Sequence, residues 1–453
     1  MTPLRPVPRA DDHLEARLAR GAAAALAVNV AGVGLAVLAQ LVLARALGAE
    51  GYGVYAYVFA WVGLLVLLAT LGFETALLRF VPDYRARRAW GALKGVVRHA
   101  ERRTLAAGIG LAAVGVPAVL LLLGPERPML AVTFCIGLAA VPVAALLRVR
   151  GSTVRGFGHP AVALAADVPV REATILLAVG VVVSAPAATG ALDASAAMAA
   201  MLLGTGFGLA AVSVARHRLC LRRVPAVAPW ADGAGWSRVA AGLLLIAGMN
   251  LALRRVDILL VGALLGTTEA GAYTVAVYAA DLAALPLLAV NAIFAPTIAA
   301  LYGAGERERL RHLVTATARW GAAAALAIAA PLFVLAPWLL ALFGHEFVAA
   351  ADALRIVLAG NLARALAGSV VLLMTLTGHE RQAAAVFAAA VAASLALNAV
   401  LIPAFGLVGA ASATALTMIG WSAALAVLVR ANLSLVPGVF GRRRPEGAGG
   451  AAD

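Results

Sequence analysis

The chain has 453 residues, of which 63% are hydrophobic and only 13% charged, and its formal net charge is +14. Soluble domains carry roughly a quarter charged residues, so this composition excludes an ordinary soluble protein and indicates that a membrane surrounds most of the chain. Cys135 and Cys220 are the two cysteines, too few for a disulfide framework or a cysteine metal site.

Apolar runs of roughly 20 residues, the length that crosses a hydrocarbon core, recur along the sequence. In chain order they predict twelve transmembrane helices, at residues 22–44, 53–78, 104–124, 129–147, 161–184, 194–215, 239–264, 271–300, 319–343, 353–377, 382–403 and 408–430. Prolines inside these spans, Pro169 among them, are expected to bend their helices. The expected fold class is all-α, a polytopic membrane protein.

Basic residues mark one side of the membrane. With the N-terminus in the cytoplasm, the inner segments hold most of the 36 basic residues, and the outer turns hold only Arg45, Arg127 and Arg355 beside several acids. The positive-inside rule then places both termini in the cytoplasm and explains the net charge without a nucleic-acid partner. The first residues lack the apolar core of a signal peptide. We expect a bacterial plasma (inner) membrane protein.

A stretch rich in proline, glycine and tryptophan, VPAVAPWADGAGW at 224–236, separates the sixth predicted helix from the seventh. The halves share a pattern: Leu47-Gly48 with Gly53 and Tyr55 recurs 218 residues later as Leu265-Gly266 with Gly271 and Tyr273. The predicted organisation is a cytoplasmic N-terminal segment at 1–20, an N-lobe of six helices at 21–223, a cytoplasmic connector at 224–237, a C-lobe of six helices at 238–430 and a cytoplasmic tail at 431–453. Two such parallel repeats around a central cavity indicate a transporter.

Four arginines fall at mid-span depth: Arg171, Arg254, Arg255 and Arg364. A basic side chain at the bilayer centre costs roughly 2.5–3.5 kcal/mol on insertion scales, so such residues normally face a bundle interior or an aqueous cavity. Guanidinium groups form bidentate hydrogen bonds with phosphate, and we therefore expect these arginines to bind an anionic head group. Asn250 and Asn361, within one turn of them, are predicted to line the same cavity or to form interhelical hydrogen bonds.

Acids in the same spans leave an alternative open for two of these arginines. Asp167 precedes Arg171 by four residues, and Arg254 precedes Asp257 by three. Both spacings place the two side chains on one helix face. Each pair could therefore be an intrahelical ion pair that stabilises its own burial and binds no substrate.

The remaining charges also have two interpretations. Asp281 or Glu172 could pair with Arg255 or Arg364 across the cavity. Alternatively, an acid could bind a coupling proton or sodium ion, as intramembrane acids do in pumps. The candidates for this role are Asp167, Glu172, Asp257 and Asp281.

Catalytic motifs are absent from the sequence. It has no histidine pair at metal spacing, no phosphate-binding glycine loop with a terminal lysine and no serine nucleophile motif. We expect no enzyme activity, no metal and no cofactor.

Five segments resemble the polysaccharide and O-antigen flippases of the multidrug/oligosaccharidyl-lipid/polysaccharide exporter superfamily. They are LARALGAEGYGVYAY at 43–57, LGFETALLRFVPDY at 71–84, RRVDILLVGALLGTTEAGAY at 254–273, FGHEFVAAADALRIVLAG at 343–360 and IPAFGLVGAASATA at 402–415. The resemblance extends over about residues 20–430.

This resemblance implies a non-enzymatic flippase. Such proteins move polyprenyl-pyrophosphate-linked oligosaccharide units to the outer leaflet for lipopolysaccharide or exopolysaccharide biosynthesis, by alternating access between two six-helix lobes. The implied partners are the lipid-linked oligosaccharide, membrane lipids and polysaccharide assembly proteins, with a proton or sodium ion as the coupling ion. One alternative is an ion-coupled drug or small-solute exporter of the same superfamily, and another is a membrane glycan polymerase or glycosyltransferase.

Overall fold

The computed structural model describes residues 10–184, 192–230, 232–433 and 435–439, and every regular element in these residues is a helix. The α-helices are α1 (Ala10–Thr70), α2 (Phe73–Ala86), α3 (Trp90–Leu122), α4 (Pro128–Gly156), α5 (Pro160–Ala166), α6 (Val168–Ser184), α7 (Ala194–Ala215), α8 (Gly233–Leu264), α9 (Thr267–Asp281), α10 (Leu285–Gly303), α11 (Arg307–Val334), α12 (Ala336–Ala341), α13 (Ala351–Ala367), α14 (Val370–Leu376) and α15 (Glu380–Leu433). The predicted all-α class is confirmed. The ends of the predicted N-terminal segment and tail lie outside the described residues.

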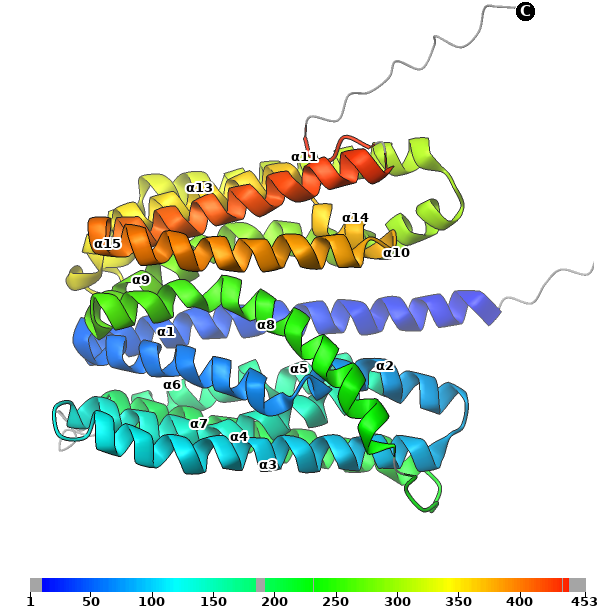
Figure 1. Ribbon diagram of the computed structural model, residues 1–453, viewed down its shortest axis with the longest axis horizontal. Coiled ribbons are helices and arrows are strands. Elements are labelled where there is room, and N and C mark those ends of the chain that lie inside the picture. The colour runs from blue at the N-terminus through cyan, green and yellow to red at the C-terminus, as the bar shows by residue number, and fades with distance from the viewer. Residues whose placement is uncertain (1–9, 185–191, 231, 434, 440–453) are drawn as a thin grey trace, which may run out of the picture. The chain divides into compact units, whose positions relative to one another are not determined.

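The two longest helices each reverse direction at a glycine. Gly48 in α1 and Gly406 in α15 have non-helical backbone angles, with φ of 67° and 58°. After each reversal the second half runs back beside the first (Figure 1). The hydroxyl of Tyr52 donates to Gln40 Oε1 at 2.9 Å across the α1 turn, and Asn432 Nδ2 donates to Gln382 Oε1 at 2.6 Å between the far ends of α15. Each helix therefore supplies two spans.

Seven helices in the described chain are long and apolar enough to cross a membrane. The number is eight when the bent pair of His345–Ala367, which includes α13, and α14 counts as one span. Because α1 and α15 each contain two of the predicted spans, these helices account for ten. The other two predicted spans are α5 with α6, which is interrupted at Asp167, and α8, which carries four charged residues. The twelve predicted spans are thus recovered.

The chain forms two compact units, Met1–Gly248 and Met249–Asp453, and the boundary falls inside α8. The first half of α8 packs within the N-terminal unit. There, a Cβ on Gly72 would lie 2.0 Å from the carbonyl oxygen of Ala240, and only glycine permits this approach. The lobe limits expected from the sequence remain predictions.

The glycines of the sequence repeat occupy equivalent turns. Gly48 has φ 67° and ψ 178°, and Gly266, between α8 and α9, has φ 116° and ψ 170°. Positive φ favours glycine at both positions. In the following helices the equivalent side chains of Tyr55 and Tyr273 are buried, at 1% and 0% exposure. The repeat in the sequence therefore corresponds to a repeated turn in the structure.

The predicted inner segments of the N-terminal unit meet at one end of it. Glu74 of α2 lies 3.7 Å from Arg148 and 3.4 Å from Arg155, both on α4. Lys94 of α3 donates to the carbonyl of Pro225 in the connector at 2.7 Å. This agrees with their predicted placement on the same side of the membrane.

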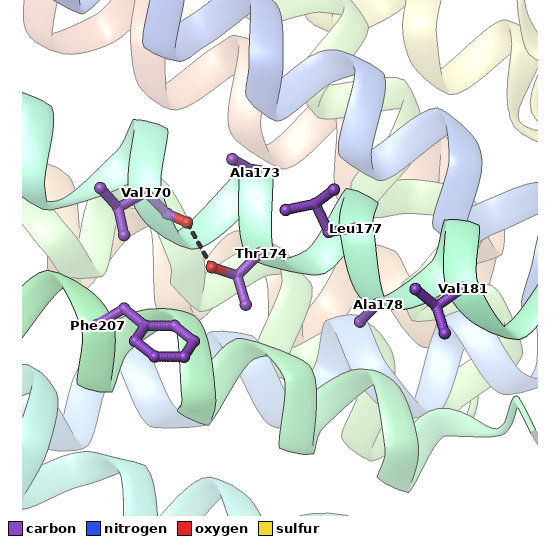
Figure 2. A pocket seen from close by; sticks show the side chains of 7 residues that line it. All are labelled: Val170, Ala173, Thr174, Leu177, Ala178, Val181 and Phe207. Atoms are coloured by element: carbon purple, nitrogen blue, oxygen red, sulfur yellow. Dashed lines mark hydrogen bonds between the residues drawn. The ribbon is translucent and has the colours of Figure 1, made fainter.

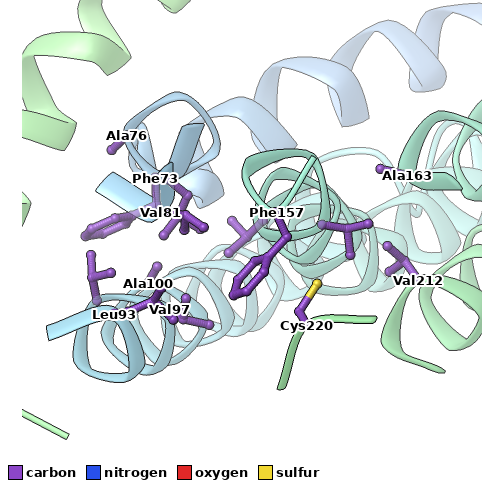
Figure 3. Packing of buried hydrophobic residues seen from close by; sticks show 14 of the residues in the cluster. Phe73, Ala76, Val81, Leu93, Val97, Ala100, Phe157, Ala163, Val212 and Cys220 are labelled. Atoms are coloured by element: carbon purple, nitrogen blue, oxygen red, sulfur yellow. The ribbon is translucent and has the colours of Figure 1, made fainter. Parts of the chain in front are cut away.

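An apolar cluster of buried residues packs helices of the N-terminal unit against one another (Figure 3). It contains Phe73 and Val81 of α2, Leu93 of α3, and Phe157 after α4, with Trp236 of α8 only 2% exposed. The indole Nε1 of Trp236 donates to the hydroxyl of Tyr84 at 2.9 Å. Buried aromatic and aliphatic contacts therefore attach the end of the connector to α2 and α3.

Candidate functional site

In the N-terminal unit, Arg171 lies in the first turn of α6 between two acids. Its Nε and Nη2 donate to Glu172 Oε1 at 3.0 and 2.8 Å, and its Nη1 lies 3.6 Å from Asp167 Oδ1. Its guanidinium carbon is 5.6 Å from the centre of the Phe59 ring, a cation–π distance. Glu172 is 2% exposed, and its Oε2 has no hydrogen-bond partner among the described residues.

This group stands at a helix break. Asp167 separates α5 from α6 with a backbone ψ of −95°. Pro169, the second residue of α6, removes one backbone donor at the start of that helix. The α6–α7 packing is close here, because a Cβ on Gly204 of α7 would lie 2.9 Å from the Cα of Arg171. The break and this contact fix the position of Arg171.

In the C-terminal unit, the other three arginines lie near one another on α8 and α13. Arg255 donates from Nη1 to the Tyr278 hydroxyl at 3.1 Å. It also interacts electrostatically with Asp281 at the end of α9. Arg364 of α13 interacts with both Asp281 and Arg254. We call Arg254, Arg255, Asp281, Tyr278 and Arg364 the arginine cluster.

The arginine cluster lacks full charge compensation. None of its three arginines forms a salt bridge with a carboxylate in the described part of the chain. Arg254 is exposed. The Nε of Arg364 is buried without a hydrogen-bond partner among the described residues. These guanidinium groups therefore carry positive charge that no described carboxylate neutralises in a salt bridge.

Asp257 does not pair with Arg254. Its Oδ1 accepts from the backbone N–H of Ile258 at 2.8 Å, and its Oδ2 accepts from Tyr273 and Thr414 hydroxyls, each at 3.0 Å. Asp257 is 3% exposed, and its side chain points to the buried face, whereas Arg254 is exposed. The ion pair considered from the spacing is therefore absent between these two described residues.

The two asparagines differ in environment. Asn361 of α13 is 1% exposed, and its Nδ2 donates to the carbonyl of Ala280 at 3.0 Å. Its Oδ1 has no hydrogen-bond partner in the described residues. Asn250 of α8 is exposed. Asn361, one turn before Arg364, therefore adds an unsatisfied acceptor beside the arginine cluster.

The ten predicted site residues thus fall into two groups. Arg171, Asp167 and Glu172 belong to the N-terminal unit, and Arg254, Arg255, Arg364, Asp257, Asp281, Asn250 and Asn361 belong to the C-terminal unit. Glu172 pairs with Arg171, its neighbour in the chain.

Sequence reasoning missed the aromatic and hydroxyl partners in these groups. They are Phe59, Tyr273, Tyr278 and Thr414. Tyr273 lies in the sequence repeat at the position equivalent to Tyr55, and this equivalence could have indicated that both side chains are buried. Thr414 lies 157 residues from Asp257, and no spacing rule connects the two.

A hollow of about 670 Å³ lies along α6 and α7 of the N-terminal unit (Figure 2). Val170, Thr174, Leu177 and Val181 of α6 line it with Phe207 of α7 and two alanines. Its lining is apolar except for the Thr174 hydroxyl. We call it the α6–α7 pocket.

Comparison with known proteins identifies the family. The profile of the polysaccharide biosynthesis protein family matches residues 18–302, and that of the MatE family matches residues 245–404. No curated protein matches the chain significantly.

Solved structures share the fold at low sequence identity. A multidrug resistance MATE family transporter of the MOP superfamily, in an inward-facing conformation, is 16% identical with a TM-score of 0.73, over 91% of this chain and 98% of its own. A MOP superfamily transporter from Pyrococcus furiosus is 14% identical with a TM-score of 0.64, over 92% and 95%. A MATE protein in a bent conformation is 15% identical with a TM-score of 0.63, over 92% and 95%.

The profile of the polysaccharide biosynthesis protein family covers more than half of the chain. The shared fold extends over 98% of the inward-facing MATE transporter. These neighbours are transporters. The chain therefore belongs to the polysaccharide biosynthesis protein family of the MOP exporter superfamily, and it is a multi-pass membrane transporter.

Proposed function

We propose that this transporter is a flippase for polyprenyl-pyrophosphate-linked oligosaccharide in a bacterial plasma membrane, with both termini in the cytoplasm. It moves the lipid-linked unit by alternating access and catalyses no bond change. The product serves the assembly of lipopolysaccharide or exopolysaccharide. Asp281 and Glu172 are the acids that we assign to charge balance or ion coupling in this cycle.

The arginine cluster is the observation that carries this proposal. Three guanidinium groups lie on spans of one unit, and none forms a salt bridge with a described carboxylate. A protein tolerates such charges in a membrane when they meet a ligand or water. A pyrophosphate offers the oxygens that guanidinium groups bind bidentately.

Drug export is the second candidate, because solved structures with this fold include multidrug resistance transporters. Many such drugs are cations, and Arg254, Arg255 and Arg364 would repel a cation. Arg255 interacts electrostatically with Asp257 and Asp281, and Arg364 interacts with Asp281. Asp257 already accepts three hydrogen bonds. The charge balance favours an anionic substrate.

Two variants of α13 test the proposal. Arg364→Ala removes a member of the arginine cluster, whereas Arg355→Ala removes an arginine of the same helix that pairs with Asp352 at 3.0 Å. Losing one charged hydrogen bond to phosphate costs about 1.5–3 kcal/mol, or roughly ten- to a hundredfold in binding. We expect Arg364→Ala to reduce export by about that factor and Arg355→Ala to export normally.

The measurement is the sidedness of the lipid-linked oligosaccharide pool in cells that lack the chromosomal gene and carry one variant. An externally added glycosidase digests the units that have reached the outer leaflet. Under the proposal, complete units accumulate out of its reach in the deletion strain and with Arg364→Ala. An unchanged pool and sidedness in the deletion strain would instead favour a drug or small-solute exporter.

A further inference from the structure

We propose that residues 435–439, which follow α15, cap the end of α13 and thereby position Arg364 for the phosphate of the substrate. This inference rests on the flippase function proposed above. We call residues 435–439 the strap. The strap, α11, α13 and α14 all belong to the C-terminal unit.

α13 ends just after Arg364, at a break in its span. Arg364 lies in the last turn of α13, Gly368 follows with a φ of 73°, and α14 continues at an angle of 44°. The last four carbonyls of an α-helix have no partner within the helix, and a break at membrane depth is tolerated only where other groups satisfy them. The end of α13 therefore requires donors from elsewhere in the chain.

The strap supplies such a donor. The backbone N–H of Val439 donates to the carbonyl of Leu366 at 3.2 Å. Gly438 permits this approach, because a Cβ there would lie 2.5 Å from the same carbonyl oxygen. The φ of Gly438 is 82°, which also favours glycine. The contact between the strap and the last turn of α13 thus depends on Gly438.

Both ends of the strap are anchored. Leu435 is 4% exposed and belongs to an apolar cluster that also contains Val314 of α11 and Leu373 of α14. At the other end, Nε of Arg319 in α11 donates to the carbonyl of Val439 at 3.2 Å. The strap therefore connects α11 and α14 to the last turn of α13, beside the break.

The position of Arg364 depends on this turn. Its guanidinium interacts electrostatically with Asp281 and Arg254, and its Nε is buried without a hydrogen-bond partner among the described residues. The side chain also forms no salt bridge with a described carboxylate. The backbone of the last turn therefore sets where the guanidinium lies. Helix ends fray, and fraying here would move Arg364 away from the phosphate.

A matched pair of glycine variants tests the strap. Gly438→Ala adds a methyl group that the carbonyl of Leu366 cannot accommodate, and it should displace the strap. Gly378→Ala is the control, because Gly378 has a similar φ of 81° and nothing lies within 4 Å of an added Cβ. Both proteins are reconstituted at equal amounts in liposomes with radiolabelled polyprenyl-pyrophosphate-linked oligosaccharide, and the initial rate of flipping is measured against substrate concentration.

A displaced guanidinium loses about one charged hydrogen bond to phosphate, which corresponds to about tenfold in affinity. We expect Gly438→Ala to raise KM by about this factor while the maximal rate stays near that of Gly378→Ala. Equal KM values for the two variants would overturn the proposal.

A double variant shows whether the strap acts through Arg364. When Gly438→Ala is combined with Arg364→Ala, the strap has no guanidinium left to position. We therefore expect the double variant to have the KM of Arg364→Ala alone. A further tenfold increase would show that the two changes act independently, and it would refute the positioning role.

A second pair of variants decides the matter if Gly438→Ala does not insert. Arg319→Ala removes the side-chain donor to Val439, whereas Arg309→Ala removes an arginine of the same helix that pairs with Glu306 at 2.8 Å. One hydrogen bond corresponds to about two- to tenfold. We expect Arg319→Ala to raise KM by such a factor and Arg309→Ala to leave it unchanged. The same KM for both would contradict the strap.

The strap and the flippase function fail in different ways. A wild-type KM for Gly438→Ala beside a raised KM for Arg364→Ala would refute the strap and leave the function standing. A wild-type protein that moves no glycan in the same liposomes would refute the function itself.

Discussion

At the scale of single residues, Asp257 is a buried acid whose two carboxylate oxygens both accept hydrogen bonds. Tyr273 and Thr414 both donate to its Oδ2, and their hydroxyl oxygens lie 3.2 Å apart. All three side chains are buried. The network connects α8, α9 and the second half of α15. We infer that it stabilises the C-terminal unit and does not bind substrate.

Tyr273→Phe tests this role. The variant removes one donor from a buried carboxylate, and hydrogen bonds between membrane helices contribute roughly 0.6 to 1.7 kcal/mol. We expect thermal unfolding of the purified protein to begin at a lower temperature. Tyr302→Phe is the control, since Tyr302 is 37% exposed and its change should leave the unfolding temperature as it is. Equal unfolding temperatures for the two variants would show that the network adds no stability.

The contacts of single residues were only partly predictable from the sequence. The four-residue spacing of Asp167 and Arg171 placed them on one face, and the structure holds them 3.6 Å apart. The three-residue spacing of Arg254 and Asp257 gave the same expectation and no ion pair forms. Partners distant in the chain, such as Thr414, satisfy Asp257 instead, and local periodicity carries no information about them.

At the scale of helices, the reversal within α15 depends on close backbone contact. A Cβ on Gly409 would lie 1.9 Å from the carbonyl oxygen of Leu401, on the other arm of the turn. Gly406 supplies the positive φ. The sequence predicted two spans here, and the structure joins them through these glycines.

Gly409→Ala should therefore open or distort the α15 turn. Overpacking of this kind costs about 1–3 kcal/mol. Gly420 of the same helix faces open space, and Gly420→Ala should be neutral or stabilise by about 0.4–1 kcal/mol. Thermal unfolding of the two purified variants measures the difference, and an unfolding temperature for Gly409→Ala at or above that of Gly420→Ala would contradict the contact.

Helix limits were harder to predict than helix existence. The span at 161–184 was expected as one helix bent by Pro169, and the structure divides it into α5 and α6 at Asp167. Apolar length predicts that a span crosses the membrane, whereas a break depends on whether neighbouring helices leave room for it. Gly204 of α7 leaves such room next to the break, because a Cβ at this position would lie 2.9 Å from the Cα of Arg171.

At the scale of the whole molecule, composition and charge pattern predicted the class of protein, and the family profile and the solved neighbours confirm a MOP superfamily transporter. The substrate is not determined at this scale, because structures with 14–16% identity share only the fold. The uncompensated charge of the arginine cluster supports a substrate with an anionic head.

The most direct test of this function uses purified protein in liposomes that contain radiolabelled polyprenyl-pyrophosphate-linked oligosaccharide, with a proton or sodium gradient imposed. The fraction of glycan that an external glycosidase can digest is followed over time. We predict that this fraction rises from the outer-leaflet share to nearly the whole pool with the wild-type protein, and much more slowly with Arg364→Ala. A fraction that stays at the value of protein-free liposomes under either gradient would contradict the flippase function.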